Sequence, residues 1–180
     1  MTKGKKYRIP TEDRLTRQAV YYLERYSSSV ANLRRVLQRK IARAARANDL
    51  DESQFSQMLE DVIAKCERAG MVNDTSYAEV KVASQRRRGY SRRQITAKLR
   101  TKGVSAQVLE QIFAKDETSD EQAAVRLAQR KRIGPWRTRG DRESYRDKDM
   151  AALCRAGFSF DLARRIVTGD ADDLLTDQQP

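Results

Sequence analysis

Residues 99–105 read Leu-Arg-Thr-Lys-Gly-Val-Ser, and they contain the end of one helix pattern and the start of the next. Glycine is common just beyond a helix C-terminus, and serine is a preferred N-cap. Residues 153–159 read Leu-Cys-Arg-Ala-Gly-Phe-Ser and repeat the Leu, the Gly, the Ser and the apolar residue before the Ser. This recurrence predicts that one helical unit is repeated along the chain.

A second alignment has the same spacing. It pairs Ser29, Leu33, Leu37 and Lys40 with Ser91, Ile95, Leu99 and Lys102. Any helix that ends at Gly and restarts at Ser would align once by chance, but the same order of stop, cap and basic middle in three units is harder to reach by chance. Apolar residues recur at steps of three and four almost throughout, which is typical of amphipathic helices.

We therefore expect an all-α fold of three tandem three-helix repeats. The expected parts are a basic tail at 1–10, repeats at 11–70, 74–115 and 119–169, and an acidic tail at 170–180 that we expect to be disordered. In the first helix, at 12–26, we expect Tyr22, Leu23 and Tyr26 to face inward. In the fourth, which starts at 73–74, we expect Tyr77, Val80 and Ala83 to do so.

The charge balance narrows the class of partner. The 180 residues include 37 Lys or Arg and 25 Asp or Glu, which gives a formal net charge of +12. Such a balance points to nucleic acid, or to an assembly that contains it, although it also affects solubility and nonspecific association. Hydrophobic residues make up 39% of the chain, enough for small cores but not for one large core.

No motif in the sequence supports catalysis. The chain has no histidine, two isolated cysteines, and no glycine-rich phosphate-binding motif. Chemistry based on Ser, Lys or a carboxylate needs no histidine and stays open, but our prediction is a non-enzyme without cofactor or metal. The sequence has neither a membrane-length apolar run nor a signal-peptide pattern, so we expect a cytoplasmic protein. Cys66 and Cys154 lie in helical patterns and are read as core thiols.

Two stretches concentrate positive charge. Residues 84–102 contain eight Lys or Arg and no acid, and residues 33–48 contain six and no acid. For each cation the alternative is a solvated helix face, and near helix C-termini the helix dipole makes that alternative equally favourable. The expected contact surface for DNA or a partner consists of Arg35, Arg39, Lys40, Arg43, Arg86, Arg87, Arg88, Arg92, Arg93, Lys98, Arg100, Lys102, Arg130, Lys131 and Arg132.

With this order of segments, the chain resembles the regulatory protein RecX family. Short motifs at 33–40, 69–78, 89–104 and 153–161 carry the resemblance, which spans roughly residues 15–168. Two regions depart from the family pattern. The link between the second and third helices, at 42–53, is longer than usual, and residues 136–146 match poorly.

The resemblance implies an elongated, curved, solenoid-like body of three tandem three-helix repeats. It also implies a bacterial regulator of DNA repair, recombination and the SOS response. Such a regulator binds the RecA recombinase filament on DNA and modulates, most often inhibits, its ATPase, strand-exchange and co-protease activities. The family has no catalytic residues to carry over. We expect a monomer with weak, nonspecific affinity for single- or double-stranded DNA.

Two other functions stay open. A direct DNA-binding regulator of helix-turn-helix type would insert the Ser-capped, Arg-rich segment at 91–102 into a major groove. Against it, the charge is spread over three units, and no helix shows a compact set of Asn, Gln and Arg for reading bases. A helical scaffold that binds only protein is the other alternative, and the sequence does not separate it from the first two readings.

Overall fold

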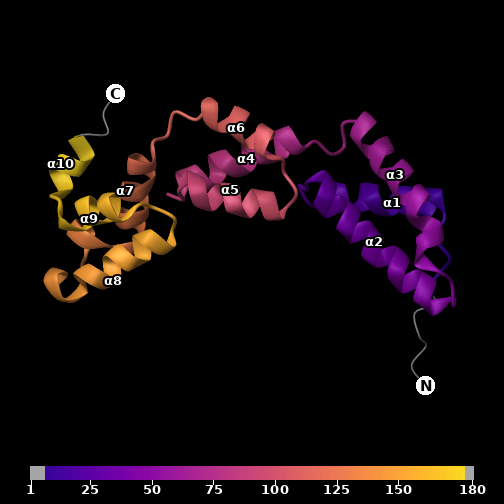
Figure 1. Cartoon of the computed structure of the whole chain (residues 1–180), viewed down its shortest axis with the longest axis horizontal. Helices are drawn as coiled ribbons and strands as arrows, with labels where there is room; N and C mark the ends of the chain where they lie inside the picture. The colour runs from indigo at the N-terminus through magenta and orange to yellow at the C-terminus, as the bar shows by residue number, and fades with distance from the viewer. Residues whose placement is uncertain (1–6, 177–180) are drawn as a thin grey trace, which may run out of the picture. The chain divides into compact units, whose positions relative to one another are not determined.

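The structure is a computed structural model, and it describes residues 7–176. Within that range the regular elements are all helical, so the predicted all-α class is confirmed (Figure 1). In chain order they are α1 (Glu12–Leu23), α2 (Val30–Ala47), η1 (Glu52–Phe55), α3 (Ser56–Arg68), α4 (Asp74–Arg87), α5 (Arg92–Thr101), α6 (Ala106–Ala114), α7 (Asp120–Lys131), η2 (Gly134–Trp136), α8 (Arg142–Arg155), α9 (Phe160–Thr168) and α10 (Ala171–Thr176), where η1 and η2 are short 3-10 helices.

The helices form two compact units. The first contains the chain up to Ala78 together with Lys102–Ser105, and the second contains Glu79–Thr101 and the chain from Ala106 onward. Helix α4 therefore contributes residues to both units. The division into three repeats at 11–70, 74–115 and 119–169 stays a prediction.

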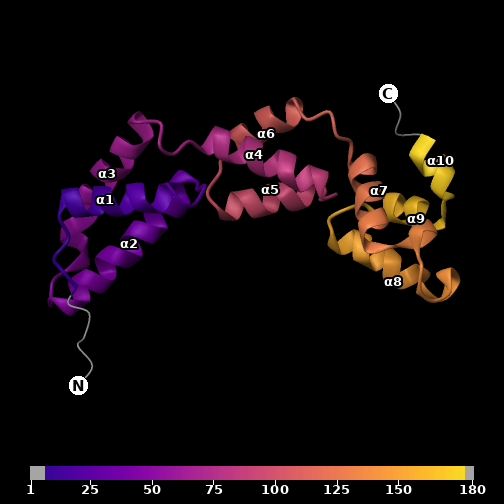
Figure 2. The same ribbon diagram turned by 180° about the vertical axis from the view of Figure 1, so that it is seen from behind.

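The core of the first unit lies between α1, α2 and α3, which are side by side in both views (Figures 1 and 2). Leu33, Leu37 and Ile41 follow one another at steps of four along α2, so they share one face, and all three are almost fully buried. Val62 and Ile63 of α3 belong to the same core. Burying each such side chain contributes about 1.5–3 kcal/mol, and this term holds the three helices together.

Helix α1 is shorter than predicted. Thr11 is its N-cap, as expected, and accepts a hydrogen bond from the backbone N–H of Arg14. The helix ends at Leu23, because the next residues turn tightly and the Arg25 N–H bonds the carbonyl of Tyr22. Tyr26 is 57% exposed, so its predicted inward position was wrong.

Helix α4 differs from prediction in the residues that it buries. Val80 is 63% exposed and Ala83 is exposed, whereas Ala78, Val82 and Arg86 are buried. These three lie at steps of four, so the buried face is displaced from the one that the apolar pattern predicts. The displacement follows from the burial of Arg86, a residue that an apolar pattern does not assign to an inner face.

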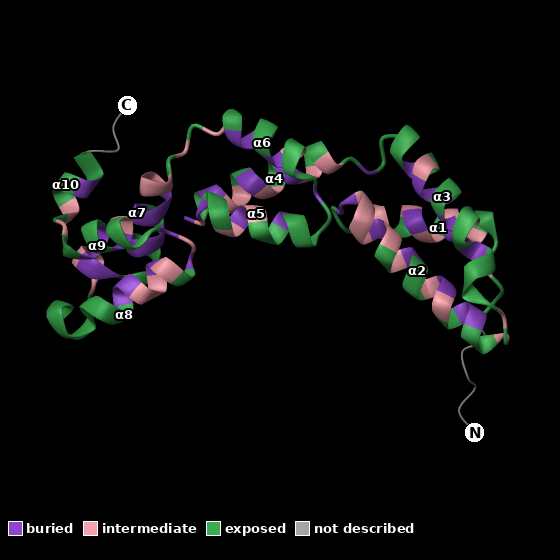
Figure 3. Cartoon of the chain, viewed as in Figure 1, coloured by how far each residue is buried: buried purple, intermediate pink, exposed green. Residues whose placement is uncertain are grey.

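The second unit has its core between α7, α8 and α9. Ala124 and Leu127 of α7 meet Leu153 of α8 and Ile166 of α9, and all four are buried (Figure 3). The C-terminal region contradicts the expected disorder within the described residues. Residues 171–176 form α10, because Leu174 is 5% exposed and joins this core. The remainder of the predicted acidic tail, 177–180, and residues 1–6 of the basic tail lie outside the described residues.

In the first unit, Ser29 ties the start of α2 to a distant segment. Its hydroxyl oxygen accepts a hydrogen bond from the Asn32 N–H and donates one to the carbonyl oxygen of Lys102. Gly103 follows that carbonyl with φ +88°, and a Cβ there would overlap the side chain of Ala31. Glycine is therefore required on both conformational and steric grounds. We call this arrangement a Ser–Gly joint.

The second unit contains the same arrangement. The hydroxyl of Ser91 accepts a hydrogen bond from the Gln94 N–H at 3.1 Å and donates one to the carbonyl of Ala156 at 2.7 Å. Gly157 follows with φ +89°, and a Cβ there would overlap the Ser91 hydroxyl. Ser91, like Ser29, is fully buried. Water does not compete for these bonds, which strengthens them.

Each Ser–Gly joint also includes an aspartate. The residue after each serine donates its backbone N–H to a carboxylate: Val30 to Asp74 at 2.8 Å and Arg92 to Asp120 at 3.0 Å. Asp74 and Asp120 are the first residues of α4 and α7. A carboxylate near a helix N-terminus is favoured by the helix dipole. The two joints thus share serine, glycine and aspartate, which supports the proposed repeat.

The joint predicts an unequal cost for two serine caps. Ser91→Ala removes the cap of α5 and leaves the buried Ala156 carbonyl without its donor, so we expect a loss of about 2–3 kcal/mol in unfolding free energy. Ser159→Ala is the matched control, because exposed Ser159 caps α9 through the Leu162 N–H. It should cost about 1 kcal/mol. Urea unfolding followed by circular dichroism measures both, and equal losses would contradict a role for the Ala156 bond.

Candidate partner-binding surface

Three of the predicted contact cations meet at one open groove in the first unit. The groove has a volume of about 610 Å³. Three cations and one carboxylate line it, so its local charge is positive, and two side-chain amides add neutral hydrogen-bonding groups. The lining residues are Asn32, Arg35, Gln38, Arg39, Ala42, Glu52 and Lys102.

The Ser–Gly joint places these cations together. Because Ser29 bonds the Lys102 carbonyl, the Lys102 side chain starts beside the first turns of α2. Arg35 and Arg39 are four residues apart on α2 and project from the same side of the helix. A residue from the end of α5 therefore joins two from α2, in a cluster that a polyanion fits.

In the second unit, the predicted cations on and before α5 are on the surface, with the exception of Arg86. Helix α5 contains no Asp or Glu, so no acid on the helix itself offsets these charges. The guanidinium of Arg92 lies 4.9 Å from the centre of the Phe113 ring, which restricts its direction. The exposed residues are Arg87, Arg88, Arg92, Arg93, Lys98 and Arg100.

Tyr90 brings cations of α5 and α7 together. Its ring centre lies 4.1 Å from Lys98 Nζ and 5.7 Å from Arg130 Cζ. Arg130 and Lys131 line a small cavity of about 140 Å³ with the same tyrosine. The half-buried ring thus packs between helices and holds two cations beside its face.

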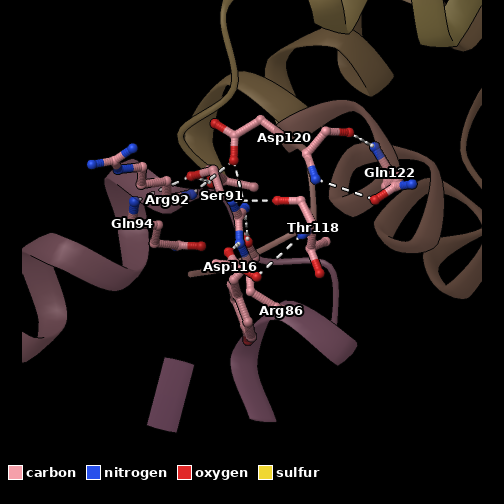
Figure 4. Close-up of polar contacts among 11 residues, drawn as sticks. Arg86, Ser91, Arg92, Gln94, Asp116, Thr118, Asp120 and Gln122 are labelled. Carbon is pink, nitrogen blue, oxygen red and sulfur yellow. Dashed lines mark hydrogen bonds and ion pairs between the residues drawn. The ribbon is translucent and has the colours of Figure 1, made fainter. Parts of the chain in front are cut away.

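Arg86 lies inside the second unit, contrary to its predicted place on the contact surface. It is 5% exposed. Figure 4 shows its guanidinium enclosed by acceptors: Asp116 Oδ2 at 2.6 Å, Asp120 Oδ1 at 2.5 Å and the Thr118 carbonyl at 2.8 Å. The carbonyl of Tyr90 accepts a fourth hydrogen bond at 3.3 Å. We therefore remove Arg86 from the proposed surface.

The Arg86 cluster organises the link between α6 and α7. Asp116 and Thr118 belong to that link, and Asp120 begins α7. Asp120 Oδ1 accepts from both Arg86 and the backbone N–H of Arg92, so the cluster shares an oxygen atom with the second Ser–Gly joint (Figure 4). The signal in the sequence was present in these acids, but their distance along the chain concealed the pairing.

The other predicted cations lie apart from the groove. Lys40 and Arg43, also on α2, line a separate cavity next to α1. Arg132 has a left-handed backbone at φ 54° and forms the C-cap of α7, and its side chain donates to Thr138 Oγ1 at 3.4 Å. For Arg132, a helix-end role accounts for the position without a partner.

A buried ion pair in the second unit was missed by sequence reasoning. Asp149 is 4% exposed and accepts hydrogen bonds from the Arg137 guanidinium and from the Gly134 N–H. Arg137 also lies over the Tyr145 ring, at 4.1 Å from its centre. The pair attaches the segment after η2 to α8. A single acid beside the buried Met150 was the available signal.

The remaining chemistry of residues 7–176 is limited. In this range no group of His, Cys, Asp or Glu is arranged to hold a metal ion, and no helix has the length and apolarity that a bilayer crossing needs. Cys66 is buried in the first core, and burial raises the pKa of its thiol above the ordinary value of 9.0. Because the thiolate is the nucleophile, this cysteine suits packing better than reactivity.

The burial of Arg86 separates it from its neighbours in a stability measurement. Arg86→Ala leaves Asp116 largely buried without its cation, and we expect a loss of about 3 kcal/mol in unfolding free energy. Arg87→Ala is the matched control, since Arg87 is exposed and should change stability by less than about 0.5 kcal/mol. Urea titration of both variants provides the comparison. Similar small effects for both would mean that the Arg86 cluster does not hold the link to α7.

Comparison with known proteins agrees with this helical architecture. A family model described as RecX, second three-helix domain, matches residues 73–111. The regulatory protein RecX of Myxococcus xanthus is 41% identical over 156 residues, which cover 85% of this chain and 83% of that protein. The regulatory protein RecX of Agrobacterium fabrum is 31% identical over 162 residues, covering 88% and 86%. No solved structure gives a significant match. On these similarities along most of its length, the chain belongs to the RecX family of regulatory proteins.

Proposed function

We propose that this protein binds the RecA recombinase filament on DNA and inhibits its ATP hydrolysis, strand exchange and co-protease activity. RecX proteins modulate RecA, and the similarity to two named regulatory proteins RecX supports the same partner here. We further propose that it acts as a cytoplasmic monomer, by binding rather than by catalysis, and that its affinity for free DNA is weak and nonspecific.

The observation that carries the proposal is the groove of Arg35, Arg39 and Lys102. These cations converge on one open space and are accompanied by a single carboxylate, Glu52. Arginine presents a planar fork of donors that matches phosphate or carboxylate oxygens. The groove therefore fits either the DNA backbone or an acidic patch of the recombinase, and both are present in a filament.

Inhibition needs only a difference in affinity between two states of the filament. A protein that binds one state more tightly shifts the equilibrium towards it, in proportion to the difference. If the favoured state hydrolyses ATP slowly, the bound regulator lowers turnover without contributing a catalytic group. The exposed cations before and along α5 add contacts in the second unit, which would increase total affinity.

The helix-turn-helix alternative is less compatible with the second unit. In that motif, residues at the start of the recognition helix reach base edges. At the start of α5, Ser91 is buried, the Arg92 N–H bonds Asp120, and the Arg92 guanidinium lies over Phe113. This end of the helix is therefore engaged in holding the fold together. Specific duplex binding that persists in excess competitor DNA would favour the alternative.

The proposed function predicts a loss of recombinase turnover. Addition of the protein to RecA on single-stranded DNA should lower the rate of ATP hydrolysis at ratios at or below one per RecA protomer. The rate is followed by a coupled spectrophotometric assay. An unchanged rate at an equal ratio would contradict the proposal.

A groove variant tests the surface that carries the proposal. Combined replacement of Arg35, Arg39 and Lys102 by Ala should weaken filament binding and flatten its salt dependence by about 0.7 per lost phosphate contact. Combined replacement of Arg68, Arg126 and Arg139 by Ala is the matched control, because these are exposed cations outside the proposed surface. Binding to the DNA-bound filament is measured by fluorescence anisotropy over a range of salt. Equal effects of the two variants would indicate net charge rather than a groove.

A further inference from the structure

The first unit has a second cavity that the proposed function leaves unused. It lies between the segment at 7–10, α1 and α2, and its volume is about 480 Å³. Pockets for small organic ligands span about 300–1,000 Å³, so this cavity is large enough for more than a simple ion. The lining residues are Tyr7, Arg8, Pro10, Arg14, Leu15, Gln18, Lys40, Ile41, Arg43 and Ala44.

The outer wall of this cavity is fastened to both helices. Asn48, at the end of α2, donates its side-chain N–H to the carbonyl of Tyr7 at 3.0 Å. Arg14 of α1 donates to the carbonyl of Ile9 at 2.9 Å. Asn48 also bonds the Ala44 carbonyl at 2.7 Å, which orients its amide. The segment at 7–10 is therefore held as part of the cavity wall.

The charge of the cavity is entirely positive. Arg8, Arg14, Lys40 and Arg43 line it, and no Asp or Glu does. Within residues 7–176, none of these four cations forms an ion pair. Four cations around one space repel one another, and an anion placed among them would relieve that repulsion. Lys40 and Arg43 were predicted contact residues, whereas Arg8 and Arg14 were not.

The uncharged part of the cavity indicates what the anion carries. Leu15, Ile41 and Ala44 provide an aliphatic floor, and Gln18 adds an amide. At the mouth stands Tyr7, which is 44% exposed and has a ring face open to a ligand. Cations next to an aromatic ring are the combination by which proteins bind single-stranded nucleic acids, with phosphates on the cations and bases on the rings.

We propose that this cavity binds one nucleotide of a single-stranded nucleic acid. The cations hold its phosphates, and the base lies against Tyr7 and the aliphatic floor. A paired duplex keeps its base faces stacked and offers the cavity only phosphates. Inorganic phosphate would leave the apolar floor unfilled. An acidic peptide carries the charge but no planar ring to stack on Tyr7, so the nucleotide satisfies more of the lining.

The proposal is tested without any recombinase, so its outcome is independent of the proposed function. The probe is a short fluorescein-labelled oligothymidylate, and binding is read by anisotropy. Tyr7→Ala should weaken binding about tenfold, since a base on an aromatic ring contributes on that scale. Tyr7→Phe keeps the ring face and should bind as the parent does. Because Tyr7 is at the surface, both variants should fold, and circular dichroism checks this.

Charge and base are separated by two further measurements. Lys40→Ala combined with Arg43→Ala should flatten the salt dependence by about 1.4, at about 0.7 per phosphate. Arg68→Ala combined with Arg126→Ala is the matched control and should leave it unchanged. An abasic oligonucleotide of equal charge should bind less tightly than the oligothymidylate. Equal binding of both strands, with no effect of Tyr7→Ala, would overturn the nucleotide site, as would equal competition by a glutamate-rich peptide or by duplex DNA.

Discussion

The hydrogen bond from a buried serine hydroxyl to a backbone carbonyl followed by glycine holds each unit together. Ser29 and Ser91 each cap a helix and grip a segment more than sixty residues away. An alanine in place of Gly103 or Gly157 would overlap the opposing residue, and both glycines have positive φ. The joint is short-range in space and long-range in sequence. It also determines where Lys102 meets the cations of α2.

The arginine run at 86–88 shows how burial divides residues of one type. Arg86 is enclosed by two carboxylates and two carbonyls, whereas Arg87 and Arg88 are exposed. Burying an unpaired guanidinium would be prohibitive, so the acids at 116 and 120 are what permit it. The same pairing orders the link before α7. Positive charge therefore serves two purposes in this chain, internal attachment and an exposed surface.

Much of the helical order could be predicted from local patterns. Caps at Thr11 and Ser29, and the glycine stops, predicted where several helices begin and end. The errors were at places where long-range contacts outweigh local pattern. Tyr26 was placed inward because periodicity continued past the turn at Leu23. Residues 171–176 were expected to be disordered because their acids outweigh Leu174, which nevertheless reaches the second core.

The sequence by itself determined the all-α class, the repeated order of stop and cap, the positive charge and the family, because these depend on composition, period and spacing. The tertiary structure alone decided which cations share a space. Arg35, Arg39 and Lys102 converge, Arg86 is withdrawn, and Arg8 and Arg14 join Lys40 and Arg43 around one cavity. The physical reason is that such groups are brought together by packing and by hydrogen bonds between distant segments, which leave no periodic signal in the chain.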